Sequence, residues 1–451
     1  MRGEDMQATR VVAMALAVAI GPGVSTVGAA AKAGNQGAAK ATEVGVTPDE
    51  IHIAVIADVD NAFSPGLFQG SVDGVQGFAK YINNSCKPKN TCVAGRKLVV
   101  DFIDSHLNAN ETRNAVIKAC SEDFAMVGTT ALFLNNVDDI VNCADKTGSA
   151  TGLPDIPAFV VELVHQCSPV SFPINPPQLD CSTKDQHPQT YRENAGTAHY
   201  YVHKFGKDLH GTFVYSNDLK SAEVGGKVLG AGVQKGGIKA DSNVGVSSLA
   251  PRSVYTPIAQ QIKTDGTNYV LNTGPFSGVV AMRQEAKLQG VNSADVIWDC
   301  FSNCYDKRLI EQGGADVEGQ YVTLSNIPFN EAKYSKPLAS YVKTVGKDKV
   351  DGFGAYAWID SMLFTDVVNQ IVKDGGNDAL TRKALLDGLG KVHSFDADGM
   401  WAKTDVAGRV PSPCFLLVQV KDGEFQRVYP KKPGTFDCKK SNRVETKNDF
   451  L

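Results

Sequence analysis

Four short stretches of small polar and aromatic residues could bind a small molecule through hydroxyls, amides and backbone N–H groups. They are residues 128–131 (GTTA), 215–218 (YSND), 272–276 (NTGPF) and 298–301 (WDCF). Each lies at or directly after the end of an apolar run that is typical of a buried strand. Polar groups and aromatic rings that converge at strand ends form the kind of cleft in which small ligands bind.

The sequence offers no motif for catalysis, for a cofactor or for a metal ion. Ser71 follows Gly70 but lacks the second glycine of a nucleophile elbow, and neither a P-loop nor an HExxH motif occurs. The eight histidines are scattered along the chain, and a single loop histidine is more often a surface residue than a catalytic one. We therefore expect no enzyme activity, no cofactor and no metal site. A hydrolase without a recognisable motif stays an alternative.

The stretch from residue 51 to residue 84 predicts the element that positions the first site residues. Residues 51–56 form an apolar, β-branched run, and apolar residues recur at spacings of three and four over residues 68–82. The first pattern predicts a buried strand and the second an amphipathic helix. Because ligands of parallel sheets bind at the carboxyl ends of strands, Asn61, Phe63 and Ser64 in the intervening loop are candidate contacts.

Strand and helix patterns alternate along most of the remaining chain. The expected further strands are residues 98–103, 124–127, 158–161, 212–215, 244–246, 269–271, 296–298 and 319–323, and a hairpin over residues 415–428. The expected helices are residues 109–120, 136–143, 195–205, 220–234, 254–263, 277–288, 307–312, 336–345, 355–372 and 381–389. This alternation predicts an α/β fold with parallel sheets between helical layers. A proline-rich segment, residues 163–190, separates two such series.

The bulk composition sets the size and excludes one class of partner. The chain has 451 residues and a formal net charge of −4. A single core stops growing at about 250–300 residues, so two lobes are expected. The near-neutral balance argues against nucleic acid as a partner, because nucleic-acid binding requires a basic face.

The amino terminus and the cysteines predict export. Residues 11–20 form an apolar run after Arg10, and small residues follow it up to residue 31. This layout is typical of a secretory signal, and the run is too short to span a bilayer. No cysteine precedes Cys86, so no thiol is available for lipid attachment. The ten cysteines favour disulfides over metal ligation in an exported protein. As a hypothesis they pair in chain order as Cys86–Cys92, Cys120–Cys143, Cys167–Cys181, Cys300–Cys304 and Cys414–Cys438.

With these residues placed, the span from residue 48 to residue 429 resembles the type I periplasmic binding proteins, the leucine/isoleucine/valine-binding-protein-like receptors of ABC importers. The resemblance rests on the order and spacing of four segments. They are IHIAVIADVDNAFSPGLFQGSVDGVQGF, ACSEDFAMVGTT, VEGQY at residues 317–321 and AYA at residues 355–357. It implies two doubly wound parallel-sheet lobes that are joined by a three-crossover hinge. The implied division is a signal peptide at 1–31, a flexible linker at 32–47, lobe I at 48–188 and 301–393, lobe II at 189–300 and 394–438, and a polar tail at 439–451.

The resemblance also implies roles for individual residues. The loop after the third strand would bind a carboxylate through hydroxyls and amides, and the loop after the fourth strand would add contacts. Asp299, although offset from the family position, is the nearest acidic residue for an ammonium group. The candidate ligand-binding residues are Asn61, Phe63, Ser64, Thr129, Thr130, Ala131, Phe133, Glu162, Ser216, Asn217, Asn272, Thr273, Phe276, Asp299, Phe301 and Tyr356.

The function that the resemblance implies is capture of a small molecule and its delivery to the membrane permease of an ABC importer. The expected ligand is a branched-chain or hydrophobic amino acid, an amide, or another apolar or aromatic acid. The protein is expected to be a monomer that is exported to the periplasm, cell envelope or exterior. A sensing receptor of the same fold without a transport role stays an alternative.

Overall fold

The computed structural model of this chain describes residues 38–62 and 65–450. The predicted signal peptide, residues 1–31, lies outside the described residues, as does the first part of the predicted linker. The second part of that linker differs from the expectation, because it packs against the folded chain. Glu43 is buried, and its carboxylate accepts hydrogen bonds from the backbone N–H groups of Lys146 (2.7 Å) and Arg382 (3.1 Å).

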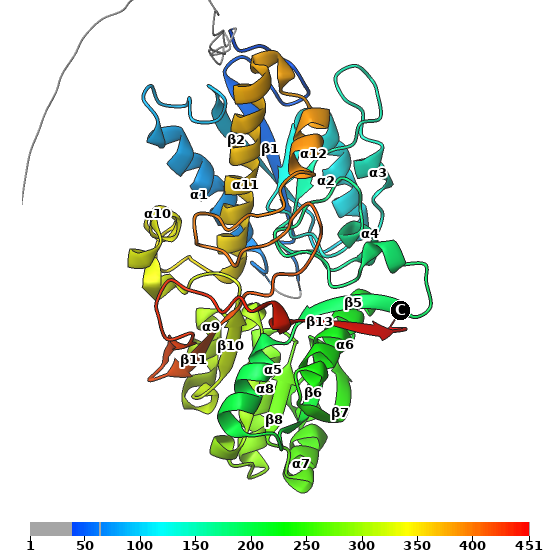
Figure 1. Ribbon diagram of the computed structural model, residues 1–451, viewed down its shortest axis with the longest axis vertical. Coiled ribbons are helices and arrows are strands. Elements are labelled where there is room, and N and C mark those ends of the chain that lie inside the picture. Colours follow the sequence, from blue (N-terminus) through cyan, green and yellow to red (C-terminus); the bar gives the residue numbers. More distant parts are fainter. Residues whose placement is uncertain (1–37, 63–64, 451) are drawn as a thin grey trace, which may run out of the picture. The chain divides into compact units, whose positions relative to one another are not determined.

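Four parallel strands form the first sheet, in the order β2-β1-β3-β4. They are β1 (Glu50–Ala57), β2 (Lys97–Asp104), β3 (Ala125–Val127) and β4 (Asp155–Ile156). The helices that cover this sheet are α1 (Gln69–Ser85), α2 (Ala109–Glu122) and α11 (Gly352–Gly375). Because side chains alternate along a strand, β1 contributes to two apolar cores. Ile53 and Val55 pack with α1 and α11, which lie side by side (Figure 1). Ala54 and Ile56 pack with α2 on the opposite face.

Seven strands form the second sheet, in the order β12-β11-β10-β9-β8-β6-β7. The parallel strands are β6 (His210–Ser216), β7 (Lys239–Val246), β8 (Tyr269–Asn272), β9 (Ile297–Cys300) and β10 (Tyr321–Leu324). The antiparallel edge strands are β11 (Leu416–Lys421) and β12 (Glu424–Tyr429). The main helices are α5 (Gly196–Phe205), α6 (Lys220–Lys235), α7 (Thr256–Asp265) and α8 (Phe276–Leu288). Phe213 and Leu271 pack with α5, whereas Val214 and Val270 pack with α7 and α8 on the other face.

The remaining elements are short or connect the two sheets. The helices are α3 (Asp138–Val141), α4 (Leu163–Gln166), α9 (Lys307–Gly313), α10 (Lys336–Val345) and α12 (Arg382–Leu389). A separate antiparallel ribbon pairs β5 (Gln189–Asn194) with β13 (Arg443–Asn448). Among the described residues, no helix has both the length and the hydropathy that a membrane span requires.

The predicted fold class is confirmed, three local predictions differ from the structure, and one strand was not predicted. The expected strand at 158–161 is a loop, and the strand that pairs with β3 is β4 instead. The sequence pattern did not indicate β4 because it contains Asp155, whose buried carboxyl is satisfied by neighbouring side chains. The predicted polar tail forms β13, and its partner β5 was not predicted, because both strands alternate polar and apolar residues weakly. β10, expected in lobe I, pairs with β9 in the second sheet.

Five disulfides join the cysteines in chain order, the same pairs that the sequence suggested. Each one links residues that are between 4 and 24 positions apart, so each closes a local loop. Bridges of this kind stabilise the fold mainly by restricting the unfolded chain, by about 2–4 kcal/mol each.

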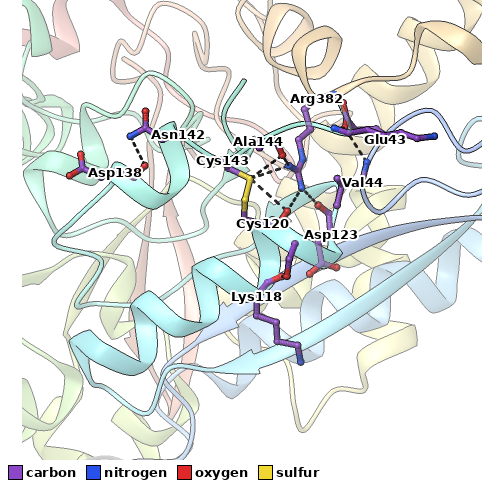
Figure 2. The surroundings of a disulfide bond; sticks show 12 residues. Glu43, Val44, Lys118, Cys120, Asp123, Asp138, Asn142, Cys143, Ala144 and Arg382 are labelled. Atoms are coloured by element: carbon purple, nitrogen blue, oxygen red, sulfur yellow. Dashed lines mark hydrogen bonds between the residues drawn. A yellow bond between two sulfur atoms is a disulfide. The ribbon is translucent and has the colours of Figure 1, made fainter. Parts of the chain in front are cut away.

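Arg382, the first residue of α12, holds the end of α2 in place. Its guanidinium is buried and donates hydrogen bonds to the carbonyl oxygens of Cys120 (2.7 Å), Asp123 (2.5 Å) and Ala144 (2.6 Å) (Figure 2). The last carbonyls of a helix have no partner within the helix, so this side chain satisfies groups that α2 leaves unpaired. The Cys120–Cys143 disulfide lies beside it, with Nη1 3.0 Å from Cys143 Sγ.

Candidate ligand-binding site

Asp58 holds together the loops that follow three strands of the first sheet. It follows β1 directly, and its buried carboxylate accepts hydrogen bonds from Ser105 Oγ (2.6 Å) and the Leu107 N–H (2.9 Å) after β2. The same carboxylate accepts the N–H of Leu132 (2.8 Å) after β3. One buried anion with three donors therefore fixes the relative positions of these loops at the edge where ligands of parallel sheets bind.

A buried polar cluster fixes the position of the loop after β3. Thr129 Oγ1 donates to Asp155 Oδ1 (3.1 Å), and Asp155 Oδ2 is contacted by His165 Nε2 (2.6 Å) and Ser171 Oγ (2.8 Å). The hydroxyl of Thr129 is thus committed to the protein itself. Thr130 Oγ1 is buried and has no hydrogen-bond partner among the described residues, and Thr130 is not part of the lining of the cavity described below.

Aromatic side chains gather beside these loops. Phe353, in the first turn of α11, packs edge-on against Phe68 with ring centroids 4.8 Å apart, and lies 5.4 Å from Phe159, which follows β4. Tyr356, one turn further along α11, packs edge-on against Trp401 at 4.8 Å. We call Phe159, Phe353 and Tyr356 the aromatic wall. It provides apolar surface at the strand ends of the first sheet.

The loops after β8 and β9 of the second sheet are tied to each other. Asn303 Nδ2 donates to the carbonyl oxygens of Thr273 (3.3 Å) and Gly274. Asn272 Oδ1 accepts the N–H of Gly274 (2.9 Å), which shapes the turn after β8. The Cys300–Cys304 disulfide closes the loop after β9. These contacts give the second sheet a preorganised polar rim.

A small cavity lies where the two sets of loops meet. Its volume is about 20 Å³, and its lining residues are Ser302, Asn303, Tyr305, Asp306, Asp351, Gly352, Phe353 and Tyr356. This space holds about one water molecule. Asp306 and Asp351 also line a larger groove of about 300 Å³, a volume near the lower end for small-molecule sites. A ligand that contacts the aromatic wall therefore requires the loops to move apart.

The two acidic residues that line both the cavity and the groove, Asp306 and Asp351, cap helices. Asp306 accepts the backbone N–H of Arg308 (2.8 Å) and pairs with its guanidinium (2.6 Å). That guanidinium also stacks over Phe276, 4.8 Å from the ring centroid. Asp351 Oδ1 accepts the N–H of Gly354 (2.7 Å) at the start of α11, and burial raises the pKa of the Asp351 carboxyl to about 6. Arg308 thus places a partly exposed cation beside two carboxyls that are anchored at helix starts.

Asp299 differs most from its expected role. Its carboxylate is buried within the second sheet and accepts hydrogen bonds from the hydroxyls of Tyr269 (2.7 Å) and Tyr201 (3.0 Å). The reason is the alternation along β9: Trp298 packs with α7 and α8, so Asp299 points into the core beneath α5. Burial raises the pKa of Asp299 to about 7. An ammonium group has no access to this carboxylate in the structure.

The other predicted residues lie at various distances from the cavity. Of these, Tyr356 lines it, and Phe276 packs under Arg308. Ser216 Oγ contacts Ser248 Oγ (2.8 Å), which holds the ends of β6 and β7 together, and Asn217 is exposed. Asn61 and Ala131 are buried, and Phe133, Glu162 and Phe301 are half-buried. Phe63 and Ser64 lie outside the described residues.

Several residues that line the cavity were not predicted from the sequence. Ser302 and Asn303 lie between two cysteines whose pairing turns them towards the cavity. Asp306 and Asp351 each precede a helix that begins with a glycine or a charged residue, a capping signal that is visible in the sequence. Phe353 follows Asp351 and lies before the apolar stretch from which the helix was predicted.

Comparison with known families decides the classification. The model of a family described as periplasmic binding protein matches residues 50–424, most of the chain. The chain belongs to this family. Membership in the periplasmic binding protein family implies a location outside the cytoplasm and a role in binding solutes, generally without catalysis. No curated protein sequence matches the chain.

Solved structures of several substrate-binding proteins share this fold. A substrate-binding protein of an ABC transporter from Aeropyrum pernix has a TM-score of 0.64 at 14% identity, covering 87% of this chain and 97% of that one. The leucine binding protein LivK from Thermotoga maritima has a TM-score of 0.62 at 16% identity, covering 84% and 97%. A fatty acid ABC transporter substrate-binding protein from Thermomonospora curvata has a TM-score of 0.63 at 13% identity, covering 87% and 97%. At these identities the likeness establishes the fold and no particular ligand.

Proposed function

We propose that this protein captures one small molecule between the loops of its two sheets and delivers it to the permease of an ABC importer. The observation that carries the proposal is the small cavity, where Ser302 and Asn303 after β9 meet Phe353 and Tyr356 of α11. Residues that follow both sheets can contact a single ligand only at such a position. The protein acts as an exported monomer and releases its ligand unchanged.

The ligand class that the site supports best is an apolar or aromatic molecule with a carboxylate, hydroxyl or amide. Phe353 and Tyr356 of the aromatic wall suit the apolar part, and Ser302 and Asn303 suit the polar part. Neighbours that are described as leucine-binding and as a fatty acid transporter component agree with an apolar ligand. The commitment of Asp299 to two tyrosines argues against an ammonium contact there, so a simple acid or amide is favoured over an amino acid.

Binding is coupled to closure of the two sets of loops. A ligand that touches both sets interacts fully only when they are close, so it stabilises the closed arrangement by its differential affinity. The cavity of about 20 Å³ between them holds about one water molecule, so the loaded form is more open than this structure, and the loops close around the ligand from a still more open free form. The closed, loaded form is the one that the permease would recognise.

A thermal-shift screen followed by calorimetry tests this proposal. Apolar and aromatic acids, their amides and the corresponding amino acids are compared, because a bound ligand raises the stability of the protein by mass action. For a ligand that binds, Phe353→Ala is expected to weaken affinity at least about tenfold through lost apolar contact. Phe205→Ala, at an exposed phenylalanine on α5, is the matched control and should bind normally. Equal affinity of the Phe353→Ala variant would place the ligand elsewhere.

A further inference from the structure

A second cluster of side chains lies on the first sheet, on the face that α2 covers. His52 on β1, Asp101 on β2 and Asp123 between α2 and β3 each offer one ligand atom, and these atoms all lie within 4.8 Å of one another. His52 Nδ1 and Asp101 Oδ2 are 3.0 Å apart. Three ligand atoms around one first-row cation lie about 3–4 Å from each other. Small side-chain rotations therefore suffice to bring this set around a single ion.

The carboxyl of Asp123 has only another acid, Asp101, as its close side-chain neighbour within this cluster's pair of aspartates. The residue is fully buried, and neither of its carboxylate oxygens has a hydrogen-bond partner among the described residues. Arg382 is nearby, but it bonds to the backbone carbonyl of Asp123 and not to the carboxylate (Figure 2). A buried carboxylate that accepts no hydrogen bond is strongly unfavourable. A cation bound between Asp101 and Asp123, or a proton shared by them, would satisfy it.

The surroundings of His52 match those of a metal ligand. Its second ring nitrogen, Nε2, lies 3.3 Å from Glu50 Oε2, and Glu50 in turn pairs with Lys97 at 3.0 Å. Metal-bound histidines commonly donate their other N–H to a carboxylate, which fixes the ring orientation and directs the lone pair to the metal. Here such a contact leaves Nδ1 directed at Asp101.

We propose that His52, Asp101 and Asp123 bind one divalent transition-metal cation, with Zn²⁺ as the best match. One imidazole and two carboxylates suit Zn²⁺ and related first-row ions, whereas Ca²⁺ takes six to eight oxygen ligands and is disfavoured. The site joins β1, β2 and the turn before β3. It lies away from the carboxyl ends of the strands, so it is separate from the proposed solute site and acts on stability. Motif spacing fails to reveal it because the three ligands come from three separate elements.

Calorimetric titration of the tag-free, chelator-treated full chain with Zn²⁺ alone tests the proposal. The expected result is one saturable site, with Ca²⁺ binding much more weakly. Asp123→Asn should abolish this site, and Asp101→Asn, at a partly exposed position, should do the same with little risk to folding. Glu50→Gln should weaken binding by about 10–100-fold, because it removes only the support of His52.

His210→Gln provides the matched control. His210 Nδ1 contacts Asp241 Oδ2 at 2.6 Å, so it forms a histidine–aspartate pair that lacks the third ligand. Its replacement should leave Zn²⁺ affinity unchanged. Two results would overturn the proposal: no saturable Zn²⁺ binding by the wild-type chain, or binding that persists in both aspartate variants at wild-type affinity. In either case the two carboxyls would instead share a proton.

Discussion

Replacement of Asp299 by asparagine tests how the second sheet is built. In the structure this carboxyl is 1% exposed and lies between the hydroxyls of Tyr201 and Tyr269. Burial raises its pKa from 3.8 to about 7, although both hydroxyls favour the charged form. Below about pH 7 the protonated form is therefore the more stable one within the fold. Asparagine is similar in shape and stays neutral at every pH.

The sign and size of the effect follow from proton linkage. Between the unfolded and folded pKa values the folded chain binds more protons, so the stability that Asp299 contributes is present at low pH and is lost as the pH rises towards 7. Over the two pH units between about pH 5 and pH 7 the loss amounts to about 2 kcal/mol, and it approaches about 3 kcal/mol by about pH 8. The side chain is fully buried, so solvent screening reduces this figure little.

Urea denaturation of the wild type and of Asp299→Asn at about pH 5 and pH 8 measures the effect. The free energy of unfolding of the variant, relative to the wild type, should rise by about 3 kcal/mol between the two pH values. Asp49→Asn, at an exposed aspartate, is the control and should track the wild type at both. A difference between Asp299→Asn and the wild type that is the same at both pH values would refute the assignment. The variant should also keep wild-type affinity for the ligand, because the carboxylate faces the core.

Two further predictions concern the first sheet. Asp58→Ala removes the common acceptor of Ser105, Leu107 and Leu132; the expected loss is about 3 kcal/mol in the free energy of unfolding, together with weaker ligand binding as the loops separate. Urea denaturation and calorimetry measure both effects, and unchanged values of both would contradict the positioning role of Asp58. Replacing Cys120 and Cys143 together by alanine opens a loop of 23 residues and should lower the free energy of unfolding by about 3 kcal/mol while ligand affinity stays unchanged. A loss of affinity in this variant would show that the disulfide also positions the site.

Much of the fold could be predicted from periodicity, because most strands are apolar and most helices carry one apolar stripe. The pattern failed where another interaction replaces apolar burial. A charged residue such as Asp155 is not expected in a buried strand, so the pattern did not predict β4. In the structure Thr129, His165 and Ser171 satisfy the carboxylate of Asp155. β5 and β13 escaped prediction because their stability comes from pairing with each other across a long sequence separation, which no local pattern encodes.

The site was harder to predict than the fold. The strand-end loops were predicted as the site because parallel sheets place ligands there. Which side chains of these loops face the cavity depends on strand alternation and on the disulfide that closes the loop after β9. Alternation turns Asp299 into the core, and the disulfide presents Asn303 instead. The sequence alone makes Asp299 and Asn303 equally good candidates for contacting a ligand, so it could not show which of the two faces the cavity.

Small-angle X-ray scattering during a ligand titration tests the central claim most directly. If one solute binds between the loops of the two sheets and holds them together, the radius of gyration should fall and level off at one ligand per chain. Mass spectrometry of the released ligand should show the compound unchanged. A radius of gyration that stays constant at full occupancy, or a ligand recovered in altered form, would contradict the account.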